Sequence, residues 1–475
     1  DEKVKDSLQK LPLALRYSPE SHRDGLATYF RMHLQGFLND WIKKNPKPAL
    51  EGERNKWNIY LDGLKIYTTI DSRMQQNAED AVEEHMKRLQ AEFFHQNTPD
   101  RNKTAPFLDL TTEEIDRIMQ RGMKSSDRWR LMKNEGKSEK IIRASFKKPT
   151  PMVVFDWNSE GHEKDTIMTP LDSIRYYKSF LRTAMMSMEP QTGHVKAWVG
   201  GLNYKHFQYD NVIQGARQAG STFKPFVYAA AIDQLRLSPC DRFPDDEYCI
   251  EAGKHGNTEA WCPKNSDGKF TLENMTLKNA LAQSKNSVTA QLMDKVGPKP
   301  VVAMARNMGI TRELLEVPSI ALGTADVNVY EMVGAFGTFA NEGVYVKPVL
   351  VTRIEDKNGT VLYEYVPETR DVMSKDVAYA MVDLMQGVVQ SGSGSRLRSQ
   401  GYDKWRPEYK EIITGYPYKL NNPIAGKTGT TQNNSDGWFM GMVPNLVTGV
   451  WVGGEERATH FKTITYGQGA SMALP

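Results

Sequence analysis

Three short motifs, far apart along the chain, contain the residue types needed for acyl transfer through a serine nucleophile. The S-x-N and K-T-G patterns each occur once, whereas S-x-x-K occurs four times, beginning at Ser7, Ser145, Ser221 and Ser266. Taken singly, each pattern is explained by a helix cap, a turn or an ordinary strand. The presence of all three motifs in one chain indicates an active site. They occur in the order S-x-x-K (221–224), S-x-N (284–286) and K-T-G (427–429), with 63 and then 143 residues between their first members.

Ser221 is the copy of S-x-x-K whose surroundings suit a nucleophile. It lies in QAGSTFKPFVYAAAID, where Pro225 is tolerated only in a first helical turn and therefore places Ser221 at or just before a helix N-terminus. The i, i+3 spacing puts its hydroxyl and the Lys224 amine on one face, and the helix dipole favours negative charge at the serine. A lysine in a desolvated cleft loses proton affinity, so Lys224 could act as general base. A capping serine followed by an exposed lysine is the expectation for the other three copies.

The elements around these motifs predict a sheet assembled from both ends of one domain. Strands are predicted at 183–188 and 194–200, joined by EPQTG, and an antiparallel meander at 424–431, 435–443 and 446–454. Helices are predicted near 271–284, 287–308 and 326–341, and an amphipathic helix capped by Ser374 ends at SGSGS, interpreted as a flexible connector. This order favours an α/β (α+β) fold with a central antiparallel sheet covered by helices.

The first 168 residues are expected to form smaller regions. Apolar residues at helical spacing between Asp24 and Asn45 predict a helix packed on a neighbouring domain, while 63–71 predicts a strand and 72–96 a long helix. Residues 97–164 are charged and weakly periodic, which indicates an insertion or accessory lobe without assigned chemistry. The predicted division is 1–60 as a linker segment, 61–168 as an inter-domain or accessory region, and 169–475 as the domain with the motifs.

Composition excludes several other classes. The 475 residues are 39% hydrophobic and 25% charged, a balance typical of folded soluble domains. A net charge of +3 gives no electrostatic case for nucleic acid, and no run of about 18 apolar residues predicts a membrane-spanning helix within this stretch. Because G-x-S-x-G and H-E-x-x-H are both missing and the nine histidines lack metal-ligand spacing, neither a metal nor another cofactor is expected.

The three cysteines, Cys240, Cys249 and Cys262, fall within one 23-residue stretch. Without C-x-x-C spacing they do not predict a zinc site. In an oxidising compartment they would form one disulfide and leave one thiol, and we favour the pair Cys249 and Cys262. Three reduced thiols in a surface loop remain the alternative.

The stretches GSTFKPF, QSKNSV, GKTGTTQNNSDGWFMG and VTGVWVGG resemble the transpeptidase domain of class A, bifunctional penicillin-binding proteins, which carry this trio of motifs as serine β-lactamases do. The resemblance covers most of the chain from about residue 60. Residues 1–60, including LPLALRYSPESHRDGLATYF, resemble the segment that follows the glycosyltransferase domain of the two-enzyme members. We therefore expect a piece of a longer protein, without that domain, its membrane anchor or the apolar helix that usually follows an ALP sequence.

The resemblance implies a role for each motif residue. Ser221 would attack the carbonyl of the penultimate D-Ala of a donor stem peptide, and Lys224 would take its proton. Ser284 would relay a proton to the leaving D-Ala amine, Asn286 would orient Lys224 and the substrate amide, and Lys427 would supply positive charge. The strand at 428–431 would bind substrate through Thr428, Gly429, Thr430 and Thr431, with Thr428 and Thr430 at the terminal carboxylate. The backbone N–H groups of Ser221 and Thr430 would form the oxyanion hole.

The resemblance implies a peptidoglycan D,D-transpeptidase that is acylated and inhibited by β-lactam antibiotics. Its partners would be stem peptides ending in D-Ala-D-Ala. Its catalytic domain would lie on the periplasmic side of a membrane to which a preceding segment anchors the protein. A D,D-carboxypeptidase or a β-lactamase would use the same nucleophile with water as acceptor, and a penicillin sensor or scaffold would be acylated without turnover. These alternatives stay open because acceptor choice depends on the shape of the groove.

Overall fold

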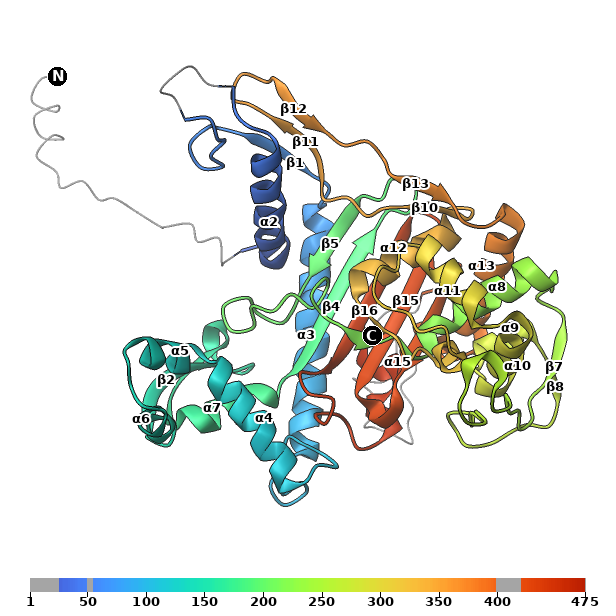
Figure 1. Cartoon of the computed structure of the whole chain (residues 1–475), viewed down its shortest axis with the longest axis horizontal. Coiled ribbons are helices and arrows are strands. Elements are labelled where there is room, and N and C mark those ends of the chain that lie inside the picture. The colour runs from blue at the N-terminus through green and yellow to red at the C-terminus, as the bar shows by residue number, and fades with distance from the viewer. Residues whose placement is uncertain (1–24, 49–53, 399–419, 475) are drawn as a thin grey trace, which may run out of the picture.

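A computed structural model describes residues 25–48, 54–398 and 420–474 (Figure 1). Its centre is a five-stranded antiparallel sheet in the order β14-β15-β16-β4-β5. Strand β16 pairs with β4 from Val447 opposite Met188 to Gly454 opposite Leu181, which joins the two ends of the domain in one sheet. The predicted antiparallel sheet and all five of its strands are therefore confirmed. The strands are β4 (Leu181–Met188), β5 (Val195–Val199), β14 (Ala425–Thr430), β15 (Asp436–Val443) and β16 (Leu446–Gly454).

Both faces of this sheet are buried. Alternate side chains along a strand point to opposite faces, and in β15 Trp438 belongs to one hydrophobic cluster while Phe439 belongs to the other. The first cluster includes the almost wholly apolar helix α8, together with α12 and α13, and the second includes α3 and α15. The sheet is thus the middle layer between two helical layers, as the sequence predicted. The helices are α3 (Ser72–Gln96), α8 (Lys224–Leu235), α12 (Val329–Ala340), α13 (Lys375–Ser391), α14 (Ile464–Gly467) and α15 (Gly469–Met472).

The helical block that follows α8 differs from the prediction in its boundaries. The helix predicted at 287–308 is two helices, because Gly297 adopts φ +79° and Pro298 cannot continue the preceding helix. The helix predicted near 271–284 is shorter, and that near 326–341 begins at Val329 after a short strand. The block comprises β6 (Arg217–Gln218), η2 (Gly220–Phe223), β7 (Arg242–Pro244), η3 (Lys254–Gly256), β8 (Asn274–Thr276), α9 (Leu277–Ala282), α10 (Asn286–Val296), α11 (Pro298–Asn307), η4 (Pro318–Leu322) and β9 (Asp326–Val327).

The structure also shows the state of two predicted loops, the cysteine-bearing loop of this block and the SGSGS run after α13. Cys249 and Cys262 form the disulfide that the sequence favoured, while Cys240 is an exposed free thiol. The SGSGS run was interpreted as a flexible connector, but Ser393 donates its N–H to Ala282 O at 3.1 Å, and its hydroxyl lies 2.5 Å from Thr428 Oγ1. This run is therefore bound to the sheet and to α9.

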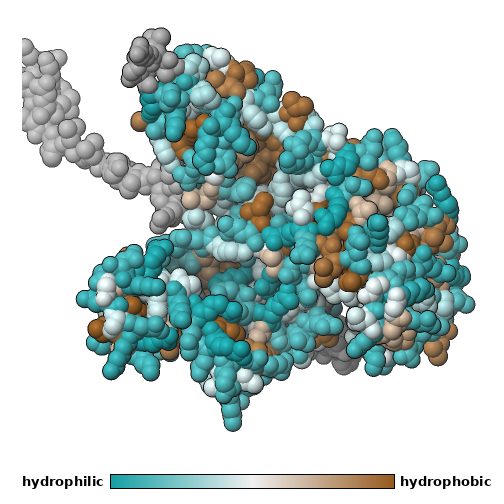
Figure 2. Space-filling view, viewed as in Figure 1, coloured by the Kyte–Doolittle hydropathy of each residue, from teal (hydrophilic) through white to brown (hydrophobic). Residues whose placement is uncertain are grey.

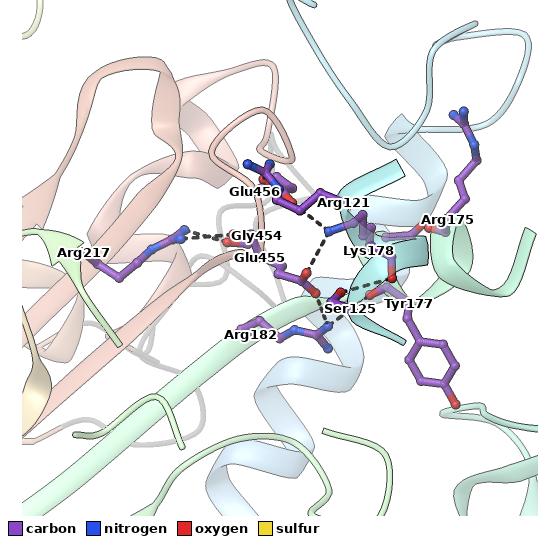
Figure 3. A network of polar contacts seen from close by, with 12 residues as sticks. Arg121, Ser125, Arg175, Tyr177, Lys178, Arg182, Arg217, Gly454, Glu455 and Glu456 are labelled. Atoms are coloured by element: carbon purple, nitrogen blue, oxygen red, sulfur yellow. Dashed lines mark hydrogen bonds and ion pairs between the residues drawn. The ribbon is translucent and has the colours of Figure 1, made fainter. Parts of the chain in front are cut away.

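Residues between α3 and β4 form a separate lobe at the lower left of Figure 1. Some of its apolar side chains make two small clusters of their own, whereas Phe155 and Trp157 join the cluster of α3, and α7 packs against α4. Figure 3 shows its link to the sheet, where Lys178 lies 2.7 Å from both Glu455 and Glu456, and Arg182 lies 2.8 Å from Glu455. The lobe contains α4 (Thr112–Ser125), α5 (Asp127–Asn134), α6 (Glu139–Ser145), β2 (Thr150–Phe155), η1 (Glu160–His162), β3 (Glu163–Met168) and α7 (Pro170–Lys178).

The predicted N-terminal helix is α2 (Thr28–Lys44), and its Phe30, Leu38 and Trp41 join the larger hydrophobic cluster. A second, three-stranded sheet in the order β1-β11-β12 lies beside it at the top of Figure 1. The face in Figure 2 is mostly hydrophilic, with apolar residues in small groups, and in the described ranges no helix is long and apolar enough to cross a membrane. The remaining elements are β1 (Lys65–Thr68), β10 (Val344–Val346), β11 (Val351–Glu355), β12 (Val361–Glu364), β13 (Thr369–Asp371), η5 (Ser395–Arg398) and η7 (Gln432–Asn434).

Candidate active site

Ser221 lies in a tight turn pressed against the edge strand β14. The turn is the 3-10 segment η2, and the α-helix α8 begins only at Lys224, three residues after the serine. Gly220 adopts φ +55°, and a Cβ at this position would lie 2.9 Å from Thr430 O, so the close approach of turn and strand requires glycine. The Ser221 hydroxyl is partly exposed and makes no hydrogen bond to the residues that the structure describes. It is available to a reactant.

The Lys224 amine is the centre of the predicted cluster. Its side chain is completely buried, and Nζ lies 2.5 Å from Ser284 O, 2.6 Å from Asn286 Oδ1 and 3.2 Å from Ser284 Oγ. Burial is the main cause that holds the pKa of Lys224 well below its usual range, and the charges of Lys427 and Lys285 lower it further. The structure therefore favours the neutral amine.

The hydrogen-bond partners of Lys224 determine whether its neutral amine can accept a proton. Ser284 O and Asn286 Oδ1 are carbonyl oxygens, which only accept, so they occupy both hydrogens of a neutral amine. The remaining tetrahedral position is a lone pair, which can accept a proton from a hydroxyl group. Asn286 Oδ1 thus holds one hydrogen of the Lys224 amine, and its orienting role in catalysis stays a prediction.

Lys427, on strand β14, contacts Ser284, the serine that also contacts Lys224. Its Nζ lies 2.9 Å from Ser284 Oγ and 2.9 Å from Thr428 O, and burial lowers the pKa of Lys427 to about 7. Ser284 adopts φ +57°, a conformation that costs a residue other than glycine about 1–3 kcal/mol. This strained corner between α9 and α10 places one hydroxyl in contact with two amines, a geometry suited to passing a proton.

The free edge of β14 presents backbone groups to the nucleophile turn. Thr431 donates its N–H to Asp436 O at 3.1 Å, and backbone groups alternate in direction along an antiparallel strand. The N–H of Thr430 therefore points away from β15, toward the edge against which Gly220 packs. The C=O of Thr428 has the same direction, which explains its contact with Lys427 Nζ. This arrangement fits the predicted oxyanion donor at Thr430.

The side chains of the predicted substrate-binding strand have different surroundings. Thr430 accepts the Gly469 N–H at 3.0 Å, and Thr428 shares a hydrogen bond with Ser393. Gly429 has no room for a side chain, because a Cβ would lie 2.9 Å from Ala219 O. The Thr431 hydroxyl is buried at the turn, 2.9 Å from Ser435 Oγ and 3.2 Å from Asp436 Oδ2. Thr428 and Thr430 lie on the same face of β14, whereas the Thr431 hydroxyl bonds within the turn.

Sequence reasoning missed a buried hub behind the S-x-N motif. Asp245, which is fully buried, accepts hydrogen bonds from Ser287 Oγ at 2.6 Å and Asn265 Nδ2 at 2.7 Å, and it pairs with Lys285 Nζ at 3.0 Å. Asn265 in turn accepts the Asn286 N–H at 2.8 Å. Hydrogen bonds from these donors hold the pKa of Asp245 below its usual range, against the effect of burial. The hub therefore fixes the start of α10 and the middle residue of the motif.

Comparison with known proteins agrees with this geometry. Residues 183–457 match the family model described as the penicillin binding protein transpeptidase domain, and residues 102–181 match the penicillin-binding protein middle domain. The chain belongs to the penicillin-binding protein family. The lobe that contains α4 to α7 falls within the second of these matches.

Several relatives of this penicillin-binding protein match over most of its length. It is 31% identical to penicillin-binding protein 1A of Aquifex aeolicus over 88% of this chain and 53% of that one, and 29% identical to penicillin-binding protein 1A of Neisseria lactamica over 97% and 53%. The chain spans about half the length of these relatives. The crystal structure of penicillin-binding protein 1A from Haemophilus influenzae has the same fold, with a TM-score of 0.62 at 19% identity over 96% of this chain and 70% of that one.

Proposed function

We propose that this penicillin-binding protein is a D,D-transpeptidase that cross-links peptidoglycan stem peptides through a Ser221 acyl-enzyme and is acylated by β-lactams. The observation that carries the proposal is the contact of two buried amines with one hydroxyl, that of Ser284, together with Ser221, three residues before Lys224, whose hydroxyl makes no hydrogen bond to the described residues. Family membership supports the same reaction class.

In the first half-reaction, Ser221 Oγ forms a bond to the carbonyl carbon of the penultimate D-Ala, and its proton passes to the neutral Lys224 amine. The resulting oxyanion is held by the N–H groups of Ser221 and Thr430, where one donor is worth about 2.7–4 kcal/mol of barrier. The C–N bond to the terminal D-Ala then breaks, and the leaving amine takes a proton through Ser284. The products are a Ser221 ester and free D-Ala.

In the second half-reaction, an amine of another stem peptide attacks the ester carbonyl. The new C–N bond forms, the ester C–O bond breaks, and the proton lost by the amine returns to Ser221 Oγ through the same lysine and serine. Thr428 and Thr430 bind the terminal carboxylate of the donor before cleavage, with the positive charge of Lys427 beside them, and Gly429 lets the strand lie close to the nucleophile turn. Thr431 contributes by holding the end of that strand.

The acylation test uses a fluorescent penicillin and two serine variants. Ser221→Ala should abolish covalent labelling and leave the thermal unfolding midpoint unchanged, because the hydroxyl makes no hydrogen bond to the described residues. Ser266→Ala is the matched control, since it removes the serine of another S-x-x-K copy at an exposed position, and it should label fully. Labelling of the Ser221 variant at the unmodified rate would remove the nucleophile assignment.

Two other functions keep the same nucleophile and are separated by the products. With a D-Ala-D-Ala peptide and an amine acceptor, a transpeptidase forms the amide, whereas a D,D-carboxypeptidase releases only the hydrolysed peptide. Rapid turnover of penicillin would indicate a β-lactamase, and a stable adduct without peptide chemistry a sensor or scaffold. Amide formation is the expected result.

The wider setting follows from the same proposal. We infer residues 1–60 to be a linker, 61–168 an inter-domain or accessory region, and 169–475 the transpeptidase domain. The whole protein would also carry a peptidoglycan glycosyltransferase and a membrane anchor, with this part on the periplasmic side. Its partners would be stem peptides and β-lactams.

A further inference from the structure

We propose that Arg217 is a positioning residue that sets the spacing between the two backbone N–H groups of the oxyanion hole. The inference rests on the proposed acyl transfer, because it assigns those donors to Ser221 and Thr430. Arg217 lies in β6, four residues before the nucleophile, and its side chain reaches across to the first residue of β15. It therefore links the two segments that must meet at the developing oxyanion.

The guanidinium group of Arg217 is held from several sides. Nε donates to Asp436 Oδ1 at 2.7 Å, Nη2 donates to Gly454 O at 2.5 Å, and the guanidinium carbon lies 4.7 Å from the centre of the Trp451 ring. Its Nη1 also reaches Glu455 O at 3.3 Å, a contact visible at the left of Figure 3. A planar group fixed in this way cannot shift without breaking charged hydrogen bonds.

Asp436 connects the guanidinium group of Arg217 to the end of strand β14. The carboxylate is fully buried and accepts hydrogen bonds from Trp451 Nε1 at 3.0 Å and Ser435 Oγ at 2.9 Å as well as from Arg217. The backbone of Asp436 exchanges two hydrogen bonds with Thr431, one from the Thr431 N–H at 3.1 Å and one to its hydroxyl at 3.0 Å. Thr431 follows Thr430 directly, so Asp436 fixes the end of the strand that carries the second oxyanion donor.

A second tie runs in parallel. Trp438 of β15 donates its Nε1–H to Gln218 O at 2.8 Å, two residues before Gly220. Two side chains thus connect β6 and β15, and Gly220 packs directly on Thr430 between them. Positioning matters because a displacement of about 1 Å at a catalytic group can cost about 100-fold in rate.

The experiment measures acylation by penicillin in Arg217→Gln and in Arg217→Lys. Arg217→Gln should lower the acylation rate constant about 10- to 100-fold while the dissociation constant of the initial noncovalent complex changes less than about twofold, because the oxyanion exists only after attack. Affinity for an arylboronic acid, which forms a tetrahedral adduct with a serine hydroxyl, should fall in parallel. Arg217→Lys should recover part of the rate, since an amine can still pair with the Asp436 carboxylate.

The control is Arg457→Gln. Arg457 pairs with Asp326 at the same 2.7 Å distance, and Asp326 lies in β9 opposite Gln218 of β6, but this pair is exposed and makes no hydrogen bond to Ser221, Thr430 or Asp436 among the described residues. It should keep the unmodified acylation rate. Because Arg217→Gln leaves a buried carboxylate without its cation and could fail to fold, Trp438→Phe serves as a second variant that removes the parallel tie without creating an unpaired charge. It should slow acylation in the same selective way.

The outcomes separate this inference from the proposed function. Unmodified protein that penicillin does not label would remove the proposed function itself. Normal labelling of the unmodified protein, together with unmodified rate constants in folded Arg217→Gln and Trp438→Phe, would overturn the positioning role alone. A loss confined to the initial complex, with unchanged boronic acid affinity, would overturn it as well.

Discussion

The buried pair between Asp245 and Lys285 should be a main determinant of stability in the active domain, and Asp245→Asn tests it. The substitution keeps the shape of the side chain but removes its charge. Lys285 is 7% exposed and lies 3.0 Å from the carboxylate, so it would be left as a buried cation without a counter-charge. Removing one partner of a buried ion pair typically costs about 3–5 kcal/mol.

Hydrogen bonds at the hub add to this cost. Asp245 Oδ2 accepts the Thr271 N–H at 3.0 Å and faces Lys285, and Oδ1 accepts from Ser287 and Asn265. An asparagine must place an NH₂ group where one of these oxygens stood, so at least one buried donor would face another donor. We expect an overall loss of about 3–5 kcal/mol, which corresponds to a decrease of roughly 6–20 °C in Tm at about 2–4 °C per kcal/mol.

The assay is thermal and urea unfolding of four proteins. Asp383→Asn is the control, because its 2.7 Å pair with Lys278 is about one third exposed and should be worth at most about 1 kcal/mol. The double variant Asp245→Asn/Lys285→Met removes both charges and should recover most of the lost stability. A loss in Asp245→Asn no larger than in Asp383→Asn, or a double variant as unstable as the single one, would refute the reasoning.

Three further expectations concern other parts of the chain. The pKa of Lys427 is about 7 in the fold and about 10.4 in an unfolded chain, so between these values the unfolded chain binds more protons and stability rises with pH. Lys427→Met should therefore flatten this rise, by up to about 1.4 kcal/mol per pH unit, in urea titrations from pH 7 to 9. Replacing both Cys249 and Cys262 with serine should cost about 3 kcal/mol, the value for a loop of about 15 residues, and equal stabilities with and without reductant would contradict it. Lys178→Met removes the cation that joins α7 to Glu455 and Glu456, although Arg182 still pairs with Glu455. It should speed amide hydrogen exchange in α7, and unchanged exchange would contradict this expectation.

The elements that sequence alone predicted are those set by local patterns. Strand-like runs separated by turn signals predicted all five strands of the central sheet, and helical spacing with a capping serine predicted α13 from Lys375 to Ser391. Pro225 placed the nucleophile at the start of α8, although the first turn is 3-10 rather than α-helical. The sequence does contain a signal for the two helices that were predicted as one helix at 287–308. The Gly297-Pro298 pair between them breaks a helix.

The parts that escaped prediction depend on contacts between distant segments. Asp245 lies in a loop rich in acidic residues, and nothing local distinguishes it from Asp246, yet it is buried because α10 brings Lys285 to it. Ser393 belongs to a run whose composition is typical of a flexible linker, and it is ordered by hydrogen bonds to Ala282 and Thr428. Motif order predicted that Lys224, Ser284 and Lys427 meet, but neither their burial nor the direction of the Thr430 N–H follows from residue types.

The surroundings of the two active-site amines explain how a lysine can be neutral without a special partner. In the described part of the chain, the groups within hydrogen-bonding distance of Lys224 and Lys427 are carbonyl, amide and hydroxyl oxygens, none of which carries a charge. The buried carboxylate of Asp245 is directed to Lys285 instead. An ammonium at either position therefore lacks a counter-ion, and burial lowers the pKa of both lysines, while the charges of Lys427 and Lys285 lower the pKa of Lys224 further. The Asp245 carboxylate thus neutralises the charge of Lys285, while Lys224 and Lys427 have no counter-charge, which favours the neutral amine that the proposed mechanism uses as its base.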